Sequence, residues 1–455
     1  MQGGFKNNLN ILLTVLFSNY VYFFCMKIVL SISEGHIVKN LLENGLIESI
    51  NKRLPEAEVI LITPAYRIQE FTETWSERGV YKFEKLLPYR SLRKHRILSS
   101  LRKKLSKRGW KQISRFLLKR EYSIHTAQKE HYLKILEPIK EEVLVLCTHI
   151  HLPNEAPLLN AARSLNIPSI GIVNSWDNVY KGIESHPDLS LVWNDINKKE
   201  MMDFEGYPSE AVECIGVPAF DPYFVKENHW SREEFCKKIG FDPKRPILLY
   251  ATIGQFVPFF EETFLLKTII EITKMYPLER RPQVICRLHP WSKREIFNSF
   301  KNEENLYFSG FKNYLPTLGW CPTYEEVVYA GNLLNHSDIC LTPGSTMTLE
   351  AAIFDTPIIV PVFNDYQPEI WEDYYSRFCL VWHFGRLVRE DLLPLVRNKQ
   401  ELKDWIDKYL SDPSLYKMGR KRIVDDYVQF SDGGAINRLV DVIEKTVKQN
   451  HLLKD

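Results

Sequence analysis

The sequence predicts an α/β protein with two doubly wound parallel-sheet domains that face each other across a cleft. Three observations predict this fold class. The 455 residues are enough for two or three domains. Short apolar runs alternate with amphipathic stretches along most of the chain, as expected of a parallel sheet covered by helices on both faces. One aperiodic segment with two prolines, 216–230, interrupts this alternation and is followed by a second round of it.

The first round of alternation begins at Lys27. Continuously apolar runs predict buried strands, and apolar residues at helical spacing predict helices. The expected strands are 27–33, 58–64, 142–150, 169–175, 189–194 and 212–218. The expected helices are 36–54, 125–142, 153–168 and 197–208. Together they predict an N-terminal domain over residues 26–218.

The later part of this interruption, 219–230, is interpreted as the hinge, because the segment 216–230 carries two prolines and no periodicity. The second domain is expected over 231–430 and the C-terminal helix over 431–455, after the pair Gly433–Gly434. The expected strands of the second domain are 246–254, 283–290, 338–345, 357–363 and 380–384. In two parallel-sheet domains, ligands bind beyond the carboxyl ends of the strands, so the loops after these strands are the candidate site.

Residues 1–25 precede the first strand and contain a long uncharged, apolar run. The run is long enough to cross a bilayer, but its asparagines disfavour this, and no small-residue cleavage site follows it. Met26 and Lys27 lead directly into a buried strand, like the start of a protein. We therefore expect a dispensable extension, with a signal anchor as the alternative.

The net charge of +2 hides an uneven distribution. The segment 90–120 carries 13 Lys or Arg and no Asp or Glu, interleaved with leucines and aromatic residues. Such a pattern fits either a solvated helical face or a helix that lies on an anionic membrane surface. No nucleic-acid motif accompanies the charge, so nucleic acid is not expected as a partner. The residues expected to contact an acceptor or membrane are Arg102, Lys103, Lys104, Lys107 and Arg108.

The eight cysteines are widely scattered and form no C-x-x-C pair. This spacing disfavours a zinc knuckle or a redox motif and fits a reducing, cytosolic compartment. No metal and no cofactor are expected.

The turn "PGST" lies between an expected strand and an expected short helix, within Leu341–Pro361. Gly344, Ser345 and Thr346 supply free backbone N–H groups and hydroxyls at a helix start, which favours a phosphate ligand. Simple capping of the helix by Ser345 is the structural alternative.

The sequence "RLHP" ends another expected strand of the same domain. The imidazole of His289 can donate to a phosphate oxygen, and Arg287 can balance the charge of a diphosphate. The alternative is a histidine packed at the turn that Pro290 makes. The hydroxyl-rich turn about fifty residues later favours the phosphate interpretation.

This combination resembles the nucleotide-binding half of GT-B glycosyltransferases. "GSTMTLEAAIFDTPII" is similar to their donor-diphosphate loop and helix, and "RLHP" resembles the His-Pro motif of bacterial transferases with cytidine-nucleotide donors, including sialyl-, Kdo- and glycerophosphate transferases. "NSWDNVYKG" is similar to a segment of bacterial surface-carbohydrate transferases. The resemblance extends from Met26 to nearly the end of the chain. It implies that the N-terminal domain binds the acceptor and the C-terminal domain the nucleotide-sugar donor.

The chain departs from the retaining GT-B pattern at one position. The large retaining group carries two glutamates in the pattern Glu-x7-Glu. Glu350 matches the second glutamate, but Thr342 occupies the position of the first. We therefore expect an inverting reaction. The sequence contains no Asp-x-Asp, so a metal held in that manner is not expected.

An inverting transfer needs a base for the acceptor hydroxyl. The resemblance implies His36, in the loop after the first strand, with Asp177 of "SWDN" as competitor. Either side chain could instead cap a local turn. The resemblance also implies that Glu350, Asp365 and Gln367 bind the donor nucleotide or its sugar. The alternative for Asp365 and Gln367 is an ordinary polar loop closed by Pro368. Thr252 and Gly254 are expected near the nucleotide or the reaction centre.

We therefore expect a glycosyltransferase that moves a sugar from a nucleotide-sugar donor to a surface-glycan or lipid-linked acceptor, without a cofactor. It is expected to be cytoplasmic, with peripheral attachment to the inner face of the membrane. The alternatives are a CDP-glycerol-type glycerophosphotransferase and a non-catalytic scaffold of the same fold. An epimerase is disfavoured because its dense set of acid and base residues is not found.

Overall fold

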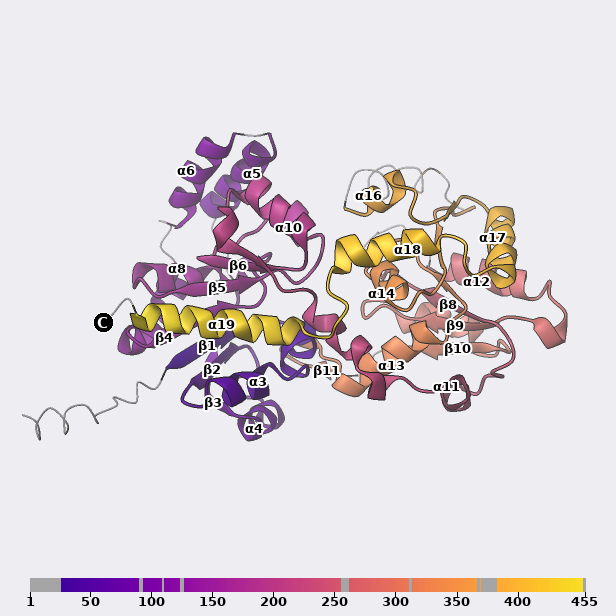
Figure 1. Ribbon diagram of the computed structural model, residues 1–455, viewed down its shortest axis with the longest axis horizontal. Coiled ribbons are helices and arrows are strands. Elements are labelled where there is room, and N and C mark those ends of the chain that lie inside the picture. The colour runs from indigo at the N-terminus through magenta and orange to yellow at the C-terminus, as the bar shows by residue number, and fades with distance from the viewer. Residues whose placement is uncertain are drawn as a thin grey trace, which may run out of the picture.

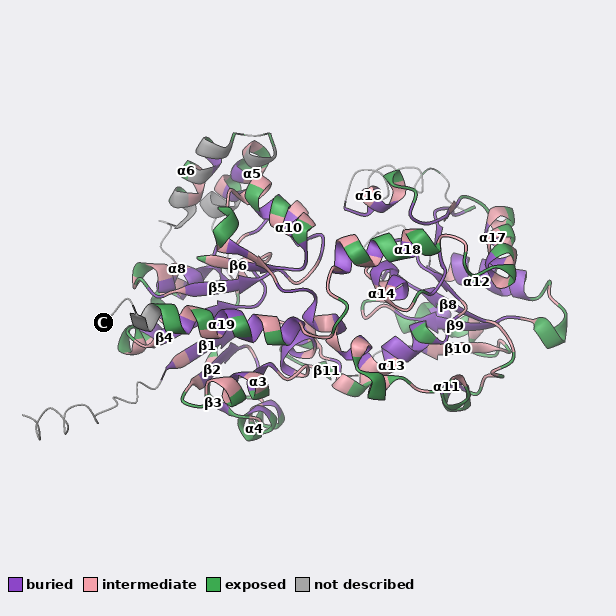
Figure 2. Cartoon of the chain, viewed as in Figure 1, coloured by how far each residue is buried: buried purple, intermediate pink, exposed green. Residues whose placement is uncertain are grey.

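The computed structural model describes residues 26–89, 93–108, 110–122, 127–254, 262–310, 313–365, 369 and 383–452. These residues form two α/β domains (Figure 1), so the expected two-domain parallel α/β architecture is confirmed. In both, the strands form the buried layer and the helices lie outside (Figure 2). The segment 1–25, for which an extension or an anchor was expected, lies outside the described residues.

The N-terminal domain is built on a seven-stranded, entirely parallel sheet in the order β3-β2-β1-β4-β5-β6-β7. Its strands are β1 (Lys27–Ser31), β2 (Glu58–Thr63), β3 (Val80–Lys85), β4 (Val143–Cys147), β5 (Ser169–Ile172), β6 (Leu189–Val192) and β7 (Val212–Cys214). The order reverses at β1, which pairs with β2 on one side and β4 on the other. This switch point is where open parallel sheets bind ligands.

Helices cover this sheet on both faces, which is why β1 and β4 are apolar nearly throughout. The helical segments are α2 (Gly35–Ile37), η1 (Val38–Leu42), α3 (Leu46–Arg53), α4 (Gln69–Glu77), α5 (Arg93–Lys107), α6 (Lys111–Tyr122), α7 (Ala127–Leu136), η2 (Glu137–Ile139), η3 (Pro153–Glu155), α8 (Ala156–Ser164), α9 (Asn178–Lys181), α10 (Asp195–Glu200), η4 (Met201–Glu205) and η5 (Ser209–Ala211). Helix α4 and the edge strand β3 were not predicted from the sequence. The alternation of exposed and buried residues along β3 is weak.

The C-terminal domain repeats the arrangement with a six-stranded parallel sheet, in the order β10-β9-β8-β13-β14-β15. Its strands are β8 (Ile247–Ala251), β9 (Gln283–Arg287), β10 (Leu306–Ser309), β13 (Ile339–Leu341), β14 (Ile358–Pro361) and β15 (Leu395–Val396). Its helical segments are α11 (Arg232–Ile239), α12 (Glu262–Thr273), η8 (Leu278–Arg280), η9 (Arg294–Phe300), α13 (Tyr324–Asn335), α14 (Met347–Ile353), α16 (Phe384–Arg389), α17 (Lys399–Ser411), α18 (Lys417–Ile423) and η11 (Val424–Val428).

The strand expected at 380–384 is not the sixth strand of this sheet. Residues 380–382 lie outside the described residues, and Phe384 begins helix α16 instead. The sixth strand is the two-residue β15. It is too short to give a periodic signal in the sequence.

The chain crosses between the domains twice. The first crossing, at the segment interpreted as the hinge, contains the short helical turns η6 (Pro218–Phe224) and η7 (Lys226–Asn228). The second follows η11, after which α19 (Ala435–Leu452) returns to the N-terminal domain (Figure 1). The apolar stripe of α19 packs into the N-terminal core beside α3.

The two crossings touch each other. The carboxylate of Asp221, in the first crossing, accepts hydrogen bonds from the N–H groups of Ala435 and Ile436, at 3.0 and 2.9 Å. These are the first two N–H groups of α19, which have no partner inside the helix. A residue of the first crossing therefore caps the helix that begins after the second.

A small hairpin, β11 (Tyr314–Leu315) and β12 (Gly319–Trp320), reaches from the C-terminal domain to the first loop of the N-terminal domain. The N–H of Gly35 donates to the carbonyl of Leu318 at 2.8 Å. A Cβ atom on Gly35 would lie 2.2 Å from the carbonyl oxygen of Trp320, so only glycine fits there. The contact fixes the loop that carries His36.

The basic segment forms the packed helices α5 and α6, but its charges do not share one face. Arg102 is only 1% exposed and donates to Glu205 at 2.7 Å and to the carbonyl of Ile183 at 2.7 Å. Lys103 pairs with Glu184 at 2.6 Å. The expectation that Arg102 contacts a membrane is therefore wrong, because its guanidinium is the buried anchor of α5. Lys103 is also turned toward the domain.

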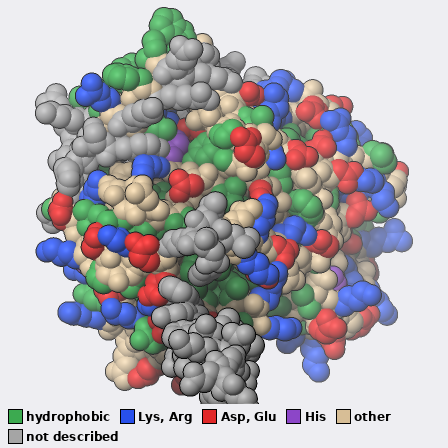
Figure 3. Space-filling view, turned by 60° about the vertical axis from the view of Figure 1, so that its left-hand side comes forward, with side chains coloured by type: hydrophobic (Ala, Val, Ile, Leu, Met, Phe, Trp, Pro, Cys, Tyr) green, Lys and Arg blue, Asp and Glu red, His purple; other side chains and the backbone are tan. Residues whose placement is uncertain are grey.

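Other residues of α5 and α6 do face solvent. Lys104 and Arg108 are exposed, while the side chain of Lys107 lies outside the described residues. Large apolar side chains are exposed beside them: Ile97, Leu101, Trp110, Ile113 and Phe116, each more than 40% accessible. Elsewhere, acidic and basic side chains are interspersed, as on the face in Figure 3. Among the described helices, none is long and apolar enough to cross a bilayer.

Candidate active site

A cavity of about 390 Å³ lies in the cleft and is lined by both domains. The N-terminal domain contributes His36, Lys39, His149, Asn174, Ser175 and Asn178. The C-terminal domain contributes Thr252, Arg287, His289, Ser345, Thr346 and Glu350. Most of these residues follow the carboxyl ends of β1, β4, β5, β8, β9 and β13, where the parallel topology places ligand sites. Seven of the residues predicted for the site therefore lie together.

The hydroxyl-rich turn reaches the cavity through Ser345 and Thr346. The Ser345 hydroxyl lies 3.0 Å from that of Thr342 and accepts from the N–H of Met347 at 3.2 Å, so part of its role is to hold the turn. Thr346 precedes α14 and, within the described chain, makes no side-chain capping bond. Gly344 shapes the turn with a positive φ of 102°. Since α14 has only seven residues, hydroxyls and nearby cations matter more here than its dipole.

His289 follows β9 and is held by Thr252. Its N–H donates to the Thr252 hydroxyl at 2.7 Å, and its ring Nδ1 accepts from the N–H of Trp291 at 3.1 Å. Burial and the charge of Arg287 lower the pKa of His289 to about 4, so the ring is neutral at pH 7. With Nδ1 accepting, its proton resides on Nε2, which can donate to a phosphate oxygen.

Glu262 supports this arrangement from beneath the cavity. Its carboxylate accepts from the N–H of Gly254 at 2.6 Å and from Ser292 at 2.8 Å, and Ser292 contacts Thr252 at 3.1 Å. Gly254 has a φ of +73°, and a Cβ there would lie 2.6 Å from Nδ1 of His289. Gly254 thus lies against His289 and is not among the cavity-lining residues.

Glu350, the residue that matches half of the retaining pattern, accepts a 2.6 Å hydrogen bond from the hydroxyl of Tyr223 in the first crossing. Thr342, at the position of the missing glutamate, is fully buried. Lys39 enters the same region from the N-terminal domain, with its ammonium 5.6 Å from the ring centre of Trp320. Burial lowers the pKa of Lys39 to about 8, even though Glu350 raises it. Lys39, which lies one helical turn beyond Gly35, was not predicted from the sequence.

His36 faces the cavity from the loop after β1. Its Nδ1 lies 3.2 Å from the carboxylate of Glu34, and its ring meets that of His149 edge-on, with centroids 5.3 Å apart. The hydrogen bond with His36, and the charges of His36 and His149, lower the pKa of Glu34 against the effect of burial. His149 also follows the end of a strand, and the rule that identified His289 would have identified it as well.

Asp177, the competing base, is nine-tenths buried and pairs with Lys181. Burial alone would raise the pKa of Asp177, but Lys181 and His383 lower it. Its neighbours Ser175 and Asn178 line the cavity, whereas Asp177 does not. Beside it, Trp176 packs edge-on against His383 of the C-terminal domain, with ring centroids 4.4 Å apart. This segment therefore joins the domains.

Two predicted sugar-binding residues are not brought into the cavity. Asp365 is exposed and does not line it. Gln367 lies outside the described residues.

The chain is similar to known proteins in both sequence and fold. The sequence model of the family described as CDP-Glycerol:Poly(glycerophosphate) glycerophosphotransferase matches residues 173–445, which is more than half of the chain. No curated protein sequence matches the chain.

Several solved structures share its fold at low sequence identity. S. aureus MnaA with UDP is 15% identical over 93% of this chain and 97% of its own, with a TM-score of 0.55. UDP-GlcNAc 2-epimerase from Neisseria meningitidis bound to UDP-GlcNAc is 14% identical over 92% and 100%, with a TM-score of 0.55. Wall teichoic acid polymerase TagF with CDPG is 14% identical over 94% and 90%, with a TM-score of 0.52. The expected GT-B fold is thereby confirmed.

Proposed function

The chain belongs to the CDP-glycerol:poly(glycerophosphate) glycerophosphotransferase family, and from this premise we propose that it transfers glycerol phosphate from CDP-glycerol to a hydroxyl of a surface-polymer acceptor. The family makes it a transferase that uses a nucleotide-linked donor, and the resemblance drawn from its motifs is confirmed at that level. Of the two donors expected from the sequence, the family match favours CDP-glycerol over a nucleotide sugar.

One observation carries the proposal: a single cavity joins His36 of one domain to Arg287, His289, Ser345 and Thr346 of the other. Group transfer needs a base on the acceptor side and positive or hydrogen-bonding groups on the leaving-group side. The cavity presents both across the cleft. A scaffold without activity would have no need to keep them together.

At the donor end, we assign the phosphates to the C-terminal domain. His289 donates from Nε2, Thr346 from its hydroxyl, and Arg287 balances negative charge as the bond to CMP breaks. Lys39 adds a second cation from the opposite domain. Because its pKa is about 8, it is protonated at neutral pH.

At the acceptor end, His36 is the proposed base. It accepts the proton of the acceptor hydroxyl, whose oxygen attacks the phosphorus that carries glycerol. The P–O bond to CMP then breaks, and CMP leaves with the bonding electrons. Glu34 stabilises the imidazolium that forms, because its carboxylate lies 3.2 Å from Nδ1. This assignment ranks His36 above Asp177, whose carboxylate is engaged by Lys181.

We also propose that the enzyme works as a peripheral protein on the cytoplasmic face of a membrane, through α5 and α6. Exposed Trp110, Phe116 and Ile113 lie among Lys and Arg residues on these helices. An amphipathic surface of this composition suits anionic lipid. It would bring the enzyme to a lipid-linked acceptor.

The proposal is tested by identifying the nucleotide that is released and the group that is added to the acceptor. The purified protein is incubated with CDP-glycerol and a lipid-anchored glycerol-phosphate oligomer, and the released nucleotide is identified by chromatography. Phosphotransfer releases CMP and adds one glycerol phosphate to the acceptor. Glycosyl transfer adds a sugar instead, and releases a nucleoside diphosphate, or CMP where the donor is a CMP-sugar. CDP-glycerol should also raise the melting temperature, since it binds the folded state. Turnover of a nucleotide sugar without turnover of CDP-glycerol would replace the proposal with the glycosyltransferase alternative.

A further inference from the structure

Glu34, His36 and His149 form a cluster of metal-ligand type at the acceptor side of the cavity. One carboxylate oxygen and one ring nitrogen from each histidine all lie within 4.8 Å of one another. His36 Nδ1 and Glu34 Oε2 are 3.2 Å apart. Two ligands at about 2.0–2.2 Å from a tetrahedral ion lie about this far from each other.

His149 provides an independent indication of a ligand. Its side chain is 8% exposed, and in the described part of the chain its Nδ1 has no hydrogen-bond partner. A buried ring nitrogen without a partner is costly unless something binds it.

The backbone holds the three residues in place without a metal. β1 and β4 pair side by side with Ser31 opposite Cys147, so their two following loops emerge together. The Thr148 hydroxyl donates to the carbonyl of Ser31 at 2.6 Å and ties one loop to the other. The N–H of His149 donates to the carboxylate of Glu155 at 2.9 Å. Such outer contacts orient metal ligands.

We propose that Glu34, His36 and His149 form a binding site for a divalent transition-metal ion of the Zn²⁺ class. Two imidazoles and one carboxylate suit such ions, whereas Mg²⁺ and Ca²⁺ prefer oxygen ligands. Both histidines line the cavity, so a ligand in the cavity can reach the cluster. This assignment departs from the expectation of a chain without metal, which rested on the lack of Asp-x-Asp and C-x-x-C motifs.

The ion and the proposed transfer reaction compete for His36. A metal bound at Nδ1, the nitrogen that faces Glu34, leaves the ring's one proton on Nε2. The Nε2 atom then has no lone pair to accept the proton of the acceptor hydroxyl. Zn²⁺ therefore inhibits transfer, and a chelator restores it. This consequence rests on the proposed role of His36 as base, whereas the site itself does not.

The site is tested first without any assay of transfer. The chelator-treated protein is titrated with Co²⁺, which is followed by its visible absorption, and Zn²⁺ is then added to displace it. The wild type should bind one ion. Glu34→Gln and His149→Gln should each lose more affinity than the ~10–100-fold that removal of an outer contact costs. Circular dichroism and melting temperature confirm that both variants fold.

His151→Ala is the matched control, because His151 lies on the same loop, 6.4 Å from the ring of His149, but outside the cluster. It should bind Co²⁺ as the wild type does. Absence of stoichiometric binding to the wild type, or unchanged affinity in both cluster variants, overturns the site.

Transfer is then measured against Zn²⁺ concentration. Inhibition that follows Zn²⁺ occupancy, and is reversed by chelator, supports the competition. Zn²⁺ that occupies the site without slowing transfer overturns the role of His36 as base and leaves the metal site standing. Activation by Zn²⁺ overturns the inhibitory consequence. The metal site and the role of His36 as base can therefore be disproved independently of each other.

Discussion

Single side chains at the donor end of the cavity are expected to set the affinity for the nucleotide. His289→Ala and Thr346→Ala each remove one donor to a charged phosphate, so each should weaken nucleotide binding by roughly 1–3 kcal/mol. The measurement is isothermal titration calorimetry with CDP-glycerol. Ser414→Ala is the control, since Ser414 is an exposed residue of the same domain whose hydroxyl donates to Asp412 and which does not line the cavity. Unchanged affinity in both site variants, with folding intact, would place the phosphates elsewhere.

Substitution of two nearby basic residues, Arg102 and Lys104, distinguishes the effect of burial on stability from the effect of charge. Arg102→Gln leaves Glu205 without its guanidinium partner inside the protein, and should cost about 3–5 kcal/mol of unfolding free energy. Lys104→Gln alters an exposed side chain and should change stability by less than about 0.5 kcal/mol. Urea unfolding of both variants gives the comparison. Equal effects would mean that the Arg102–Glu205 pair is not a buried anchor.

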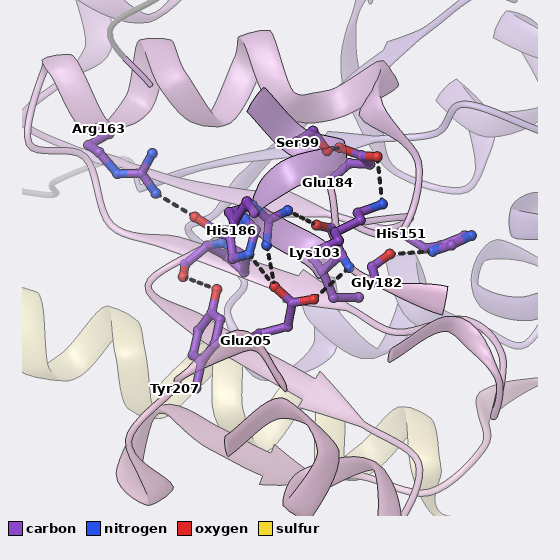
Figure 4. Close-up of polar contacts among 12 residues, drawn as sticks. Ser99, Lys103, His151, Arg163, Gly182, Glu184, His186, Glu205 and Tyr207 are labelled. Carbon is purple, nitrogen blue, oxygen red and sulfur yellow. Dashed lines mark hydrogen bonds and ion pairs between the residues drawn. The ribbon is translucent and has the colours of Figure 1, made fainter. Parts of the chain in front are cut away.

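The electrostatics of that anchor explain why its loss matters. Burial alone would raise the pKa of Glu205, but the hydrogen bond with His186 and the charge of Arg102 lower it to about 2 (Figure 4). Glu205 is therefore ionised at neutral pH with almost no access to water. Its sequence neighbourhood gives no sign of this, because both partners are distant in the chain.

The sequence predicted residues next to strand ends better than residues that meet across the cleft. His289, Ser345 and Thr346 were found because each follows an apolar run within a recognisable motif. Lys39, Tyr223 and Glu262 were missed because their roles depend on packing between distant segments. Arg102 was misassigned because a run of like charges looks the same whether one member faces inward or outward.

Among the elements, α19 depends on a cap from another segment. Asp221→Ala removes the acceptor for the first two N–H groups of α19 and should cost about 1 kcal/mol of unfolding free energy. Asp221→Asn keeps an acceptor of the same shape and should cost less. Urea unfolding at pH 7 distinguishes the two variants. An Asn variant as unstable as the Ala variant would show that the negative charge is required.

The pH dependence of the same cap has a definite sign. Burial raises the pKa of Asp221 to about 6, against the two N–H groups that lower it. The unfolded value is about 3.9, so the folded state binds the proton more tightly between roughly pH 4 and 6. The contribution of Asp221 to stability therefore falls as pH rises through that window. The unfolding free energy of the wild type minus that of Asp221→Asn should fall from pH 4 to pH 6 and then level off. A difference that grows with pH would contradict the raised pKa.

Short elements limited the prediction of the fold. The central strands β1, β4 and β8 were found because burial on both faces makes them apolar throughout. The two-residue β15 and the hairpin of β11 and β12 carry no periodic signal. Their position depends on neighbours, as the contact between Gly35 and the Trp320 carbonyl illustrates.

At the scale of the whole molecule, the exposed surface of α5 and α6 predicts binding to anionic liposomes. Each basic residue near such a surface contributes about 1 kcal/mol, and added salt screens this attraction. Lys104→Gln with Arg108→Gln should weaken binding most at low salt. Trp110→Ser with Phe116→Ser should weaken it at every salt concentration. Cosedimentation measures both pairs, and their affinity for CDP-glycerol should stay unchanged. If the wild type does not bind anionic liposomes at low salt, the exposed surface of α5 and α6 is a solvated helical face and does not bind membranes.

The two crossings also set the mechanics of the molecule. Two covalent connections link the domains, and a hydrogen bond between Asp221 and Ala435 holds the connections together. Two connections should resist twisting of one domain against the other more strongly than one connection would. A protease that cuts one connection would leave the other intact, with α19 still seated in the opposite domain. A nicked molecule should therefore migrate as one particle on a sizing column and as two fragments only after denaturation.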